Sequence, residues 1–173
     1  DTPEEAAFRA TARAWIEANA PKELEAELKS GGFGNNGLKS VDPIQVAKAW
    51  QKKKADAGWA CLHWPKEFGG RGASPIERVV WQQEEGVYGK LAGMFIIGQG
   101  MIAPTLMAYA AEPHKQRYLP PACRGEQVGE LLFQPPPVAR LAGFEAGFAS
   151  ALVAQLFFER AHGEALFDHC SSP

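Results

Sequence analysis

The sequence contains few cysteines and lacks the short motifs that mark most metal, nucleotide and nucleophile sites. Its three cysteines, Cys61, Cys123 and Cys170, lie far apart in a chain of 173 residues, and an odd count without pair spacing excludes a disulfide framework. No cysteine–histidine cluster has zinc spacing. No phosphate-binding loop, dinucleotide-binding glycine motif, zinc-protease motif or serine-hydrolase elbow is present. We therefore expect no metal and no self-contained set of catalytic residues.

An excess of basic charge is also absent. The chain carries 18 basic and 20 acidic residues, for a net charge of −2, which argues against the basic footprint of a nucleic-acid-binding protein. The only basic run, residues 52–54, falls on a helical pattern beside Asp56 and is interpreted as a solvated face. The chain opens on an acidic, helical segment rather than on a signal peptide, and the unpaired cysteines favour a reducing compartment. We expect a cytoplasmic protein with no nucleic-acid partner.

One uncharged run, residues 91–111, is long enough to cross a bilayer. It contains several glycines and Pro104, and it lacks the flanking clusters of lysine and arginine that mark membrane spans. A buried core helix explains the run better than a membrane span does. Pro104 is expected to kink or divide this helix.

The remaining start and stop signals in the sequence predict helices. Capping boxes at Thr2 and Ser74, each followed by proline, begin two helices, and Asp42-Pro43 begins another by the same logic. A short helix is expected over residues 22–28, and a last one over 112–119, ended by two prolines. The faces expected to be buried are Phe8, Ala12, Trp15 and Ile16 on the first helix, Ile44, Ala47, Trp50 and Gln51 on the third, and Ile76, Val79, Val80, Gln83 and Val87 on the fourth.

No segment before residue 127 alternates apolar and polar residues as a half-buried strand does. Residues 1–126 are therefore predicted to form an all-α, orthogonal or up-down bundle of about five or six helices. Residues 127–133 are interpreted as one possible strand. Residues 134–173 follow a run of three prolines and carry phenylalanine and leucine at helical spacing, which predicts one C-terminal helix, either docked on the bundle or exposed.

Few side chains suggest chemistry by themselves. Glu84 and Glu85 are adjacent carboxylates on a helix and point in different directions, so we interpret them as surface charge with one possible internal partner. His63 lies between tryptophans in the loop over residues 59–72, where a structural histidine, hydrogen-bonded within the loop, is the preferred interpretation over a ligand or base. His114 is expected to face solvent.

Four segments match one known family pattern in order and spacing. Residues 58–72, GWACLHWPKEFGGRG, contain its loop, in which a helix ends at Gly-Trp and an apolar run leads to Pro-x-Glu-aromatic-Gly-Gly-x-Gly. Residues 81–85 (WQQEE), 98–106 (GQGMIAPTL) and 114–126 (HKQRYLPPACRGE) match the helical segments that follow. In combination they resemble the N-terminal helical domain of the acyl-CoA dehydrogenases, and the resemblance covers residues 5–133.

The resemblance implies a flavin-dependent oxidoreductase. Members of the family oxidise the Cα–Cβ bond of an acyl-CoA thioester: a carboxylate base removes the α proton and FAD accepts the β hydride, while the protein supplies positioning and electrostatics. The family is oligomeric, and its N-terminal helices wall the acyl pocket. By resemblance, Phe95, Ile97 and Met101 line the substrate tunnel. Leu131, Phe133 and Gln134 match positions that contact the flavin, although a core or edge strand is the preferred interpretation for this chain in isolation.

Aromatic residues of the loop have a simpler interpretation. Trp59, Trp64 and Phe68 are expected to pack within the protein rather than to stack on a flavin, because large aromatic side chains usually fill cores.

The chain departs from the family after residue 133. Gln134 stands where a hydroxyl residue is expected and Pro135 where a glutamate is expected, and the Gly-Ser-Asp of the family is missing. We therefore expect this chain to lack the family's β domain and C-terminal bundle, and with them the catalytic base. Either residues 134–173 belong to a truncated or frameshifted product, or the chain is a shortened relative whose tail helix replaces the β domain.

Two functions therefore remain open. The chain is either the N-terminal domain of an acyl-CoA dehydrogenase, inactive alone, or a non-catalytic interaction module that forms a homo-oligomer or joins a full-length relative. Exposed apolar surface left by missing domains favours such association. Peripheral membrane attachment through residues 144–158 is a weaker alternative, because the polar face lacks the usual lysine and arginine.

Overall fold

The protein is described by a computed structural model, which covers residues 1–31 and 38–126 in describable detail. Within these ranges the chain forms helices and no strand, so the all-α prediction is confirmed. In order, the elements are α1 (Pro3–Asn19), η1 (Lys22–Leu24), α2 (Glu25–Ser30), α3 (Pro43–Asp56), η2 (Lys66–Phe68), α4 (Pro75–Glu85), η3 (Gly86–Phe95), η4 (Gly98–Ile102), α5 (Ala103–Tyr109) and α6 (Glu112–Cys123). The predicted strand over 128–133 and the predicted C-terminal helix lie outside the described residues.

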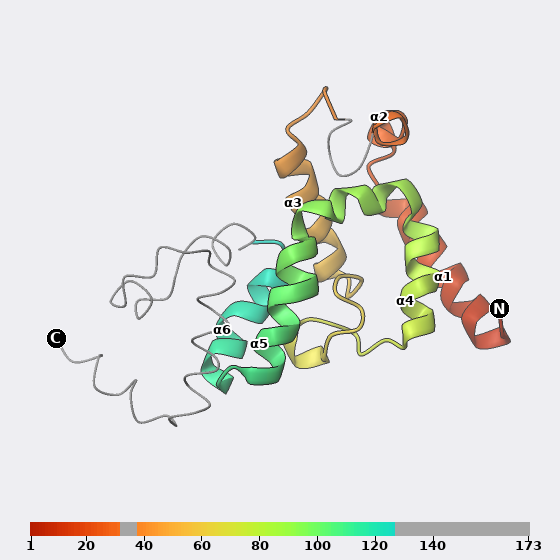
Figure 1. Ribbon diagram of the computed structural model, residues 1–173. Helices are drawn as coiled ribbons and strands as arrows, with labels where there is room; N and C mark the ends of the chain where they lie inside the picture. Colours follow the sequence, from red (N-terminus) through yellow and green to blue (C-terminus); the bar gives the residue numbers. More distant parts are fainter. Residues whose placement is uncertain (32–37, 127–173) are drawn as a thin grey trace.

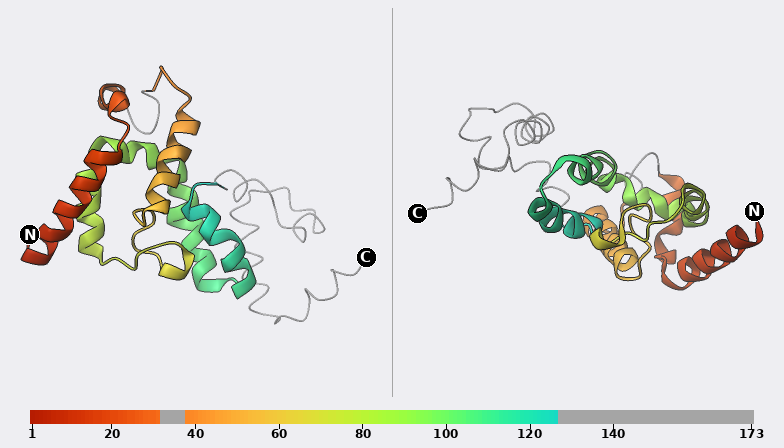
Figure 2. Two further views of the ribbon diagram at one scale, coloured as in Figure 1. Left: turned by 180° about the vertical axis from the view of Figure 1, so that it is seen from behind. Right: turned by 90° about the horizontal axis from the view of Figure 1, so that it is seen from below.

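The helices form two groups joined by η3 and by the loop between α3 and α4. Helix α1 packs along α4 on one side of the molecule, and η3 crosses from the end of α4 to α3 (Figure 1). The chain then turns into η4 and α5, which lie against α6 at the opposite end (Figure 2). The N-terminus and the end of α6 are consequently on opposite sides of the bundle.

The predicted helix starts are confirmed. The backbone N–H of Thr2 donates to the Glu5 carboxylate at 2.8 Å, and the Thr2 hydroxyl accepts from the Glu5 N–H, which forms the complete capping box. Ser74 and Glu77 form the same reciprocal pair at the start of α4. Asp42 caps α3 by accepting the Ile44 N–H at 2.8 Å. These bonds use donors that the first turn of a helix leaves unpaired, so local sequence sets the starts.

The uncharged run over residues 91–111 is broken rather than a single helix. Its first residues belong to the 3₁₀ segment η3, and a π turn, η4, precedes α5. Pro104 lies in the first turn of α5, where a residue without an N–H is tolerated. The axes of Pro75–Phe95 and Gly98–Tyr109 differ by 77°, so the run is divided between Phe95 and Gly98 and not at Pro104.

No single helix among the described residues is both long and apolar enough to cross a bilayer, and one bent pair, Pro75–Phe95 with Gly98–Tyr109, passes by length and composition alone.

Helix α6 runs further than the sequence predicted. It was expected to end at residue 119, but it continues through Pro120 and Pro121 to Cys123. The fixed φ of proline is itself helical, and both proline carbonyls are used: Arg124 N–H donates to Pro120 at 3.2 Å and Glu126 N–H to Pro121 at 3.0 Å. Burial of Leu119 and Cys123 on one face adds the packing that keeps this turn helical.

Two predicted helix faces are partly wrong. Ile44 on α3 is 51% exposed, and Ile76 and Val79 on α4 are 47% and 45% exposed. Helix α4 buries Val80, as predicted, together with Trp81, because this side meets α1 and the loop. The apolar spacing of α4 therefore includes both core residues and exposed ones.

The interpretation of the lysine run as a solvated face is also wrong in part. Lys52 and Lys53 are exposed, but Lys54 is only 4% exposed. Its position, one helical turn after Trp50, places it on the buried side of α3. The Lys54 ammonium contacts the Glu85 carboxylate at 2.8 Å, and this partner compensates the burial of the charge.

Buried side chains form two hydrophobic clusters. The first core contains Ala12, Ile16, Leu24, Leu28, Leu38, Ala47, Trp50, Trp59, Leu62, Trp81, Tyr88, Leu91 and Phe95. The second core contains Ala60, Trp64, Phe68, Ile102, Ala103, Leu106, Ala110, Leu119, Ala122 and Cys123. The loop between α3 and α4 contributes to both cores, so its conformation determines how the two helix groups are held together.

Candidate functional site

The loop between α3 and α4, residues 57–74, is a closely folded connection with unusual backbone geometry. Gly58 and Gly69 have positive φ angles of 72° and 92°, which glycine adopts without a steric penalty. Gly70 lies directly on the backbone of Trp64, and a Cβ atom there would overlap the Trp64 carbonyl. The Gly-Gly pair of the loop is thus required by close backbone contact.

Backbone hydrogen bonds hold the loop in this shape. Leu62 accepts the N–H groups of Arg71 and Ala73, at 3.2 and 2.8 Å, and Trp64 accepts the N–H of Gly72 at 2.9 Å. The two sides of the loop are therefore tied together before α4 begins. A rigid loop of this kind can present side chains to a site with little loss of entropy.

The aromatic residues of the loop are packing residues, as predicted. Trp59, Trp64 and Phe68 are 4%, 1% and 3% exposed. Trp81 stacks on Trp59 with centroids 4.6 Å apart, and the Arg71 guanidinium lies over the Trp59 ring at 3.9 Å. The faces of these rings are covered by other residues of the chain, so they are not available to stack on the ring of a bound cofactor.

A buried polar cluster lies at the centre of the first core. The Glu85 carboxylate accepts hydrogen bonds from Trp50 Nε1 at 3.0 Å and Trp81 Nε1 at 2.9 Å, and it pairs with the Lys54 ammonium at 2.8 Å. Helices α3 and α4 are joined through this one carboxylate. Every oxygen of Glu85 has a partner, so the cluster satisfies the requirements of a buried charge. Its chemistry is structural, because it presents no free donor or acceptor.

Glu84 pairs with α1 at the molecular surface. Its carboxylate accepts from Arg13 Nε at 2.8 Å and from Arg9 at 2.9 Å. The hydrogen bond from Arg13, followed by that from Arg9, lowers the pKa of Glu84 below its ordinary value. The expectation of surface charge with one internal partner is confirmed, with Glu85 as the internal residue.

The two histidines singled out from sequence are placed differently from expectation. His63 is exposed, and no hydrogen bond to it occurs among the described residues. Burial, together with the nearby charge of Arg78, lowers its pKa. His114 is half-buried rather than solvent-facing, and its ring stacks on Tyr118 with centroids 6.2 Å apart.

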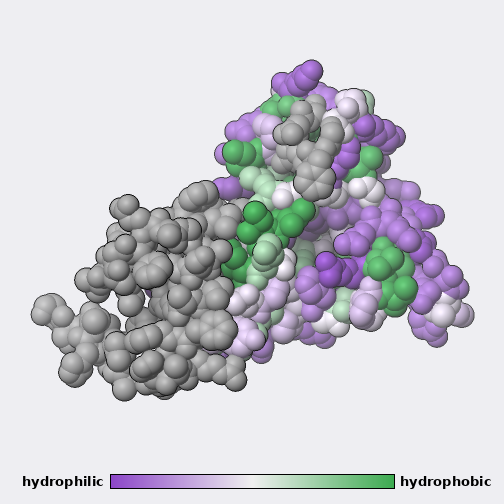
Figure 3. All heavy atoms as spheres, in the orientation of Figure 1, coloured by the Kyte–Doolittle hydropathy of each residue, from purple (hydrophilic) through white to green (hydrophobic). Residues whose placement is uncertain are grey.

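The predicted tunnel residues are divided between core and surface. Phe95 is 1% exposed and belongs to the first core, whereas Ile97 and Met101 are 50% and 65% exposed. Ile96, beside Ile97, is 52% exposed. Figure 3 shows hydrophobic surface near the middle of the molecule, where the η3–η4 segment runs in Figure 1. We call Ile96, Ile97 and Met101 the apolar ridge.

The predicted flavin-contact residues, Leu131, Phe133 and Gln134, lie outside the described residues. In residues 1–31 and 38–126, no group of three or more metal-ligating side chains occurs.

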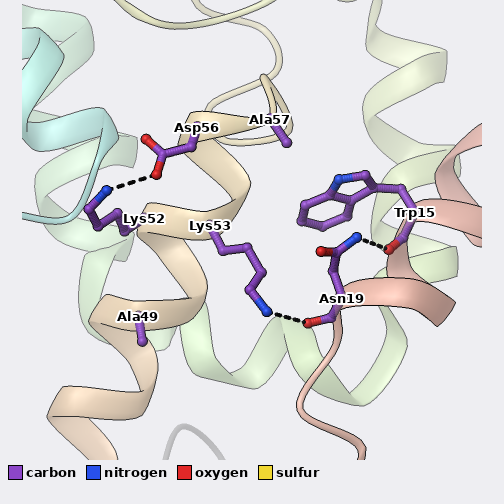
Figure 4. Close-up of a pocket in the computed structure, with 7 residues that line it drawn as sticks. All are labelled: Trp15, Asn19, Ala49, Lys52, Lys53, Asp56 and Ala57. Atoms are coloured by element: carbon purple, nitrogen blue, oxygen red, sulfur yellow. Dashed lines mark hydrogen bonds and ion pairs between the residues drawn. The ribbon is translucent and has the colours of Figure 1, made fainter.

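A groove of about 460 Å³ lies between α1 and α3 (Figure 4). Its polar side chains are already engaged: Lys53 Nζ donates to the Asn19 carbonyl at 3.1 Å, and Lys52 pairs with Asp56 at 2.8 Å. The indole ring of Trp15 forms much of the opposite wall. With its charges paired internally, this groove is a weaker candidate than the apolar ridge.

The geometry of the loop and the helices agrees with a family comparison. The family model "Acyl-CoA dehydrogenase, N-terminal domain" matches residues 2–126. The chain belongs to the acyl-CoA dehydrogenase family. The resemblance inferred from the loop and the three helical segments is thereby confirmed.

Individual relatives agree with this assignment. Acyl-CoA dehydrogenase IpdE1 of Mycobacterium tuberculosis is 33% identical over 113 residues, which are 65% of this chain and 28% of the relative. Acryloyl-CoA reductase (NADH) of Anaerotignum propionicum is 33% identical over 99 residues, 56% of this chain and 23% of the relative. The match thus spans less than a third of the length of these relatives.

Solved structures show the same helical arrangement. A variant of the Tcur3481–Tcur3483 steroid ACAD matches with a TM-score of 0.53 and 26% identity, over 73% of this chain and 30% of the matched chain. A chain of the ChsE4–ChsE5 complex from Mycobacterium tuberculosis matches with a TM-score of 0.51 and 24% identity, over 73% and 29%. The second match supports the fold alone.

Sequence reasoning missed the Lys54–Glu85 pair. A signal was present, because Ala47, Trp50, Gln51 and Lys54 follow the spacing of one helix face. The run of three consecutive lysines was interpreted as a solvated face, although one of them lies on the buried face of α3.

Proposed function

We propose that the chain supplies the helical wall of an acyl-CoA site in a flavin-dependent dehydrogenase, and that it is inactive alone. The observation that carries the proposal is the family match over residues 2–126 together with the closely folded loop at 57–74. The reaction proposed for the complete enzyme is α,β-dehydrogenation of an acyl-CoA thioester. The odd cysteine count supports a reducing, cytoplasmic setting for it.

The apolar ridge is the proposed acyl-facing surface. Ile97 and Met101 lie on an irregular stretch that includes a π turn, and such turns often occur at functional sites. Buried Phe95 supports the ridge from the core rather than lining it. An acyl chain covering Ile97 would remove apolar surface from water, which favours binding.

The described residues do not fit a flavin by themselves. Trp59, Trp64 and Phe68 are buried in the two cores, so these three rings of the loop are not available to the cofactor ring. We propose that FAD binding and the catalytic base come from polypeptide beyond residue 126 or from another chain. The role of residues 1–126 is to position an acyl group and to exclude water from it.

Matched isoleucine variants test the acyl wall. Ile97→Gln and Ile44→Gln change side chains that are 50% and 51% exposed, on the ridge and on α3. We expect Ile97→Gln to weaken the binding of octanoyl-CoA about tenfold, because burying one isoleucine is worth about 1.5–3 kcal/mol. Ile44→Gln should leave binding unchanged. Titration calorimetry measures both, and equal effects of the two variants would contradict the proposal.

Absorbance spectroscopy tests the need for further polypeptide. The chain, mixed with FAD and octanoyl-CoA, is expected to show no perturbed flavin bands and no bleaching. Bleaching by the chain alone would mean that it contains a catalytic base, and it would overturn the inactive-domain proposal.

A second proposal is that the ridge docks another protein chain. Three apolar side chains of the ridge are half or more exposed, and contiguous apolar surface often marks an interface. The steroid ACAD relative is itself named for two components, Tcur3481 and Tcur3483. We propose a homo-oligomer or a complex with a full-length relative. Light scattering should then show a dimer that Met101→Gln weakens, whereas a monodisperse monomer at high concentration would contradict it.

A further inference from the structure

The three methionines of the chain differ in how far the fold covers them. Met94 is half-buried against the first core and Met107 against the second. Met101 is 65% exposed, more than any other large apolar residue in the part of the chain that the structure describes. Folding therefore leaves one thioether open to a dissolved reagent and partly covers the other two.

Local geometry keeps the surroundings of Met101 open. The residue lies in the π turn η4, after Gly98 and Gly100, and a Cβ atom added at either glycine would lie in open space. The turn itself is held, because the Met101 carbonyl accepts a hydrogen bond from the Thr105 hydroxyl at 2.9 Å. The Met101 side chain thus projects from a fixed turn whose neighbouring residues are too small to shield it.

The surface around Met101 is apolar. Residues 91–111 contain no charged residue, and Met101 forms the apolar ridge together with Ile96 and Ile97, which are each about half exposed. Covering this ridge is favourable because it removes apolar surface from water. A polar group on the ridge would reverse part of that gain, since burying it without a hydrogen-bond partner costs free energy. A single added oxygen atom can therefore change what the ridge binds.

We propose that Met101 is a site of reversible oxidation, at which a peroxide converts the apolar thioether into a polar sulfoxide and weakens binding at the ridge. A sulfur lone pair attacks one oxygen of hydrogen peroxide, so that an S–O bond forms and the O–O bond breaks. The second oxygen leaves as water with both hydrogens. Sulfur is oxidised by two electrons and the peroxide is reduced by two.

The change can be reversed by a methionine sulfoxide reductase, which oxidises two thiols to a disulfide and releases the oxygen as water. Oxidation of Met101 follows from its exposure alone. Its consequence for acyl binding rests on the proposed role of the ridge as the acyl-facing surface. The site and its consequence therefore need separate measurements.

Peptide mapping tests the site. Trypsin releases all three methionines on one peptide, residues 91–115, and fragment ions of that peptide locate each added oxygen. The folded full chain is treated with hydrogen peroxide for increasing times and quenched with catalase. We expect Met101 to be oxidised at least about fivefold faster than Met94 and Met107, and the three rates to become similar in urea. Equal rates in the folded chain would overturn the proposal.

Titration calorimetry with octanoyl-CoA tests the consequence, by comparing each chain before and after the same peroxide treatment. We expect oxidation to weaken binding by the wild type about tenfold, and a methionine sulfoxide reductase with dithiothreitol to restore it. Met101→Leu keeps an apolar side chain of similar volume without a thioether. Whatever its initial affinity, peroxide should not change it. Unchanged binding by the oxidised wild type, or an equal loss in Met101→Leu, would overturn the switch.

A matched control and the untreated chain complete the test. Met107→Leu removes a half-buried thioether outside the ridge, so peroxide should weaken its binding as much as that of the wild type. If the untreated wild type does not bind octanoyl-CoA, the acyl-facing role of the ridge is wrong and the switch fails with it. The peptide map still decides, independently, whether Met101 is the oxidation site.

Discussion

The two cores differ in how they treat buried polar groups. In the first core, the Glu85 carboxylate accepts hydrogen bonds from the side chains of Trp50, Trp81 and Lys54. The second core contains Trp64, whose Nε1 is buried without a hydrogen-bond partner in the described part of the chain. The first core therefore contains a buried charge with all its partners, whereas at the second core the amides of Gln51 and Gln99 donate to the carbonyls of Cys123 and Ala122 and the Trp64 donor is left unpaired.

The loop between α3 and α4 connects these two arrangements. Trp59 and Leu62 belong to the first core, and Ala60, Trp64 and Phe68 to the second. A change in one core can therefore be compared directly with a matched change in the other, within one short segment or its immediate neighbours.

The largest effect is expected at the polar centre of the first core. Glu85→Gln should destabilise the fold by about 3–5 kcal/mol, because buried Lys54 loses its counter-ion. Adding Lys54→Met should restore part of the loss, since the unpaired charge is removed with its partner. Urea denaturation of both single variants and the double variant measures this coupling. Additive losses would show that the ion pair does not organise the first core.

A matched pair of tryptophans compares the cores directly. Trp81→Phe removes a donor to Glu85, whereas Trp64→Phe removes an N–H that has no partner. Both variants leave a small cavity, so their difference isolates the charge-assisted hydrogen bond. We expect Trp81→Phe to cost about 1.5–3 kcal/mol more than Trp64→Phe in urea denaturation. Equal costs would contradict the distinction between the cores.

The close backbone contact in the loop gives the next effect. Gly70→Ala would place a Cβ atom on the Trp64 carbonyl, and relieving the overlap should cost about 1–3 kcal/mol. Gly98→Ala is the control, because no atom lies within 4 Å of its added Cβ. Thermal denaturation should show a lower Tm for the first variant and an unchanged or higher Tm for the second. A similar Tm for both variants would mean that the loop backbone moves away from the added Cβ atom without a loss of stability.

The smallest effect is expected at Glu84 and depends on pH. Its pKa is lowered in the folded chain from an ordinary value of 4.5, first by Arg13 and then by Arg9. The resulting stabilisation is present above that value and is lost as the pH falls through the folded pKa. Between about pH 5 and pH 3, the wild type should lose more stability than Glu84→Gln.

Glu17→Gln serves as the control for Glu84, because Glu17 is an exposed carboxylate on α1. Urea denaturation at both pH values should show the wild-type acid dependence in this control. The same dependence in Glu84→Gln would exclude a contribution from the Glu84 ion pairs. At neutral pH we expect the cost of Glu84→Gln to be under about 1 kcal/mol, as is usual for ion pairs near the surface.

Local sequence predicted where helices begin, and it failed where packing overrides local preference. Thr2, Asp42 and Ser74 cap within a few residues of themselves, so no tertiary knowledge was required. The continuation of α6 through Pro120 and Pro121 was missed, because proline signals a helix end unless buried neighbours stabilise the turn. Pro104 was expected to kink or divide the uncharged run, but the bend lies earlier, between Phe95 and Gly98, and the 3₁₀ and π geometry was not predicted.

Only those segments of the candidate site that carry the family resemblance could be predicted from the sequence. The segment GWACLHWPKEFGGRG indicated the family, and the close contact at Gly70 shows why two adjacent glycines are needed there. The tunnel prediction placed Phe95 beside Ile97 and Met101, yet the structure buries the first and exposes the others. The tunnel residues were inferred from the resemblance, and an uncharged run that is mostly apolar gives little further signal to separate core from surface.

The sequence by itself determined the family, the all-helical class and the helix starts, because these depend on residues that are neighbours along the chain. Only the tertiary structure decided that Lys54 meets Glu85, at 2.8 Å. Residues so far apart along the chain come together only when many weak packing interactions outweigh the entropy of closing the loops between them. The burial of this ion pair is a consequence of that balance rather than of any local pattern.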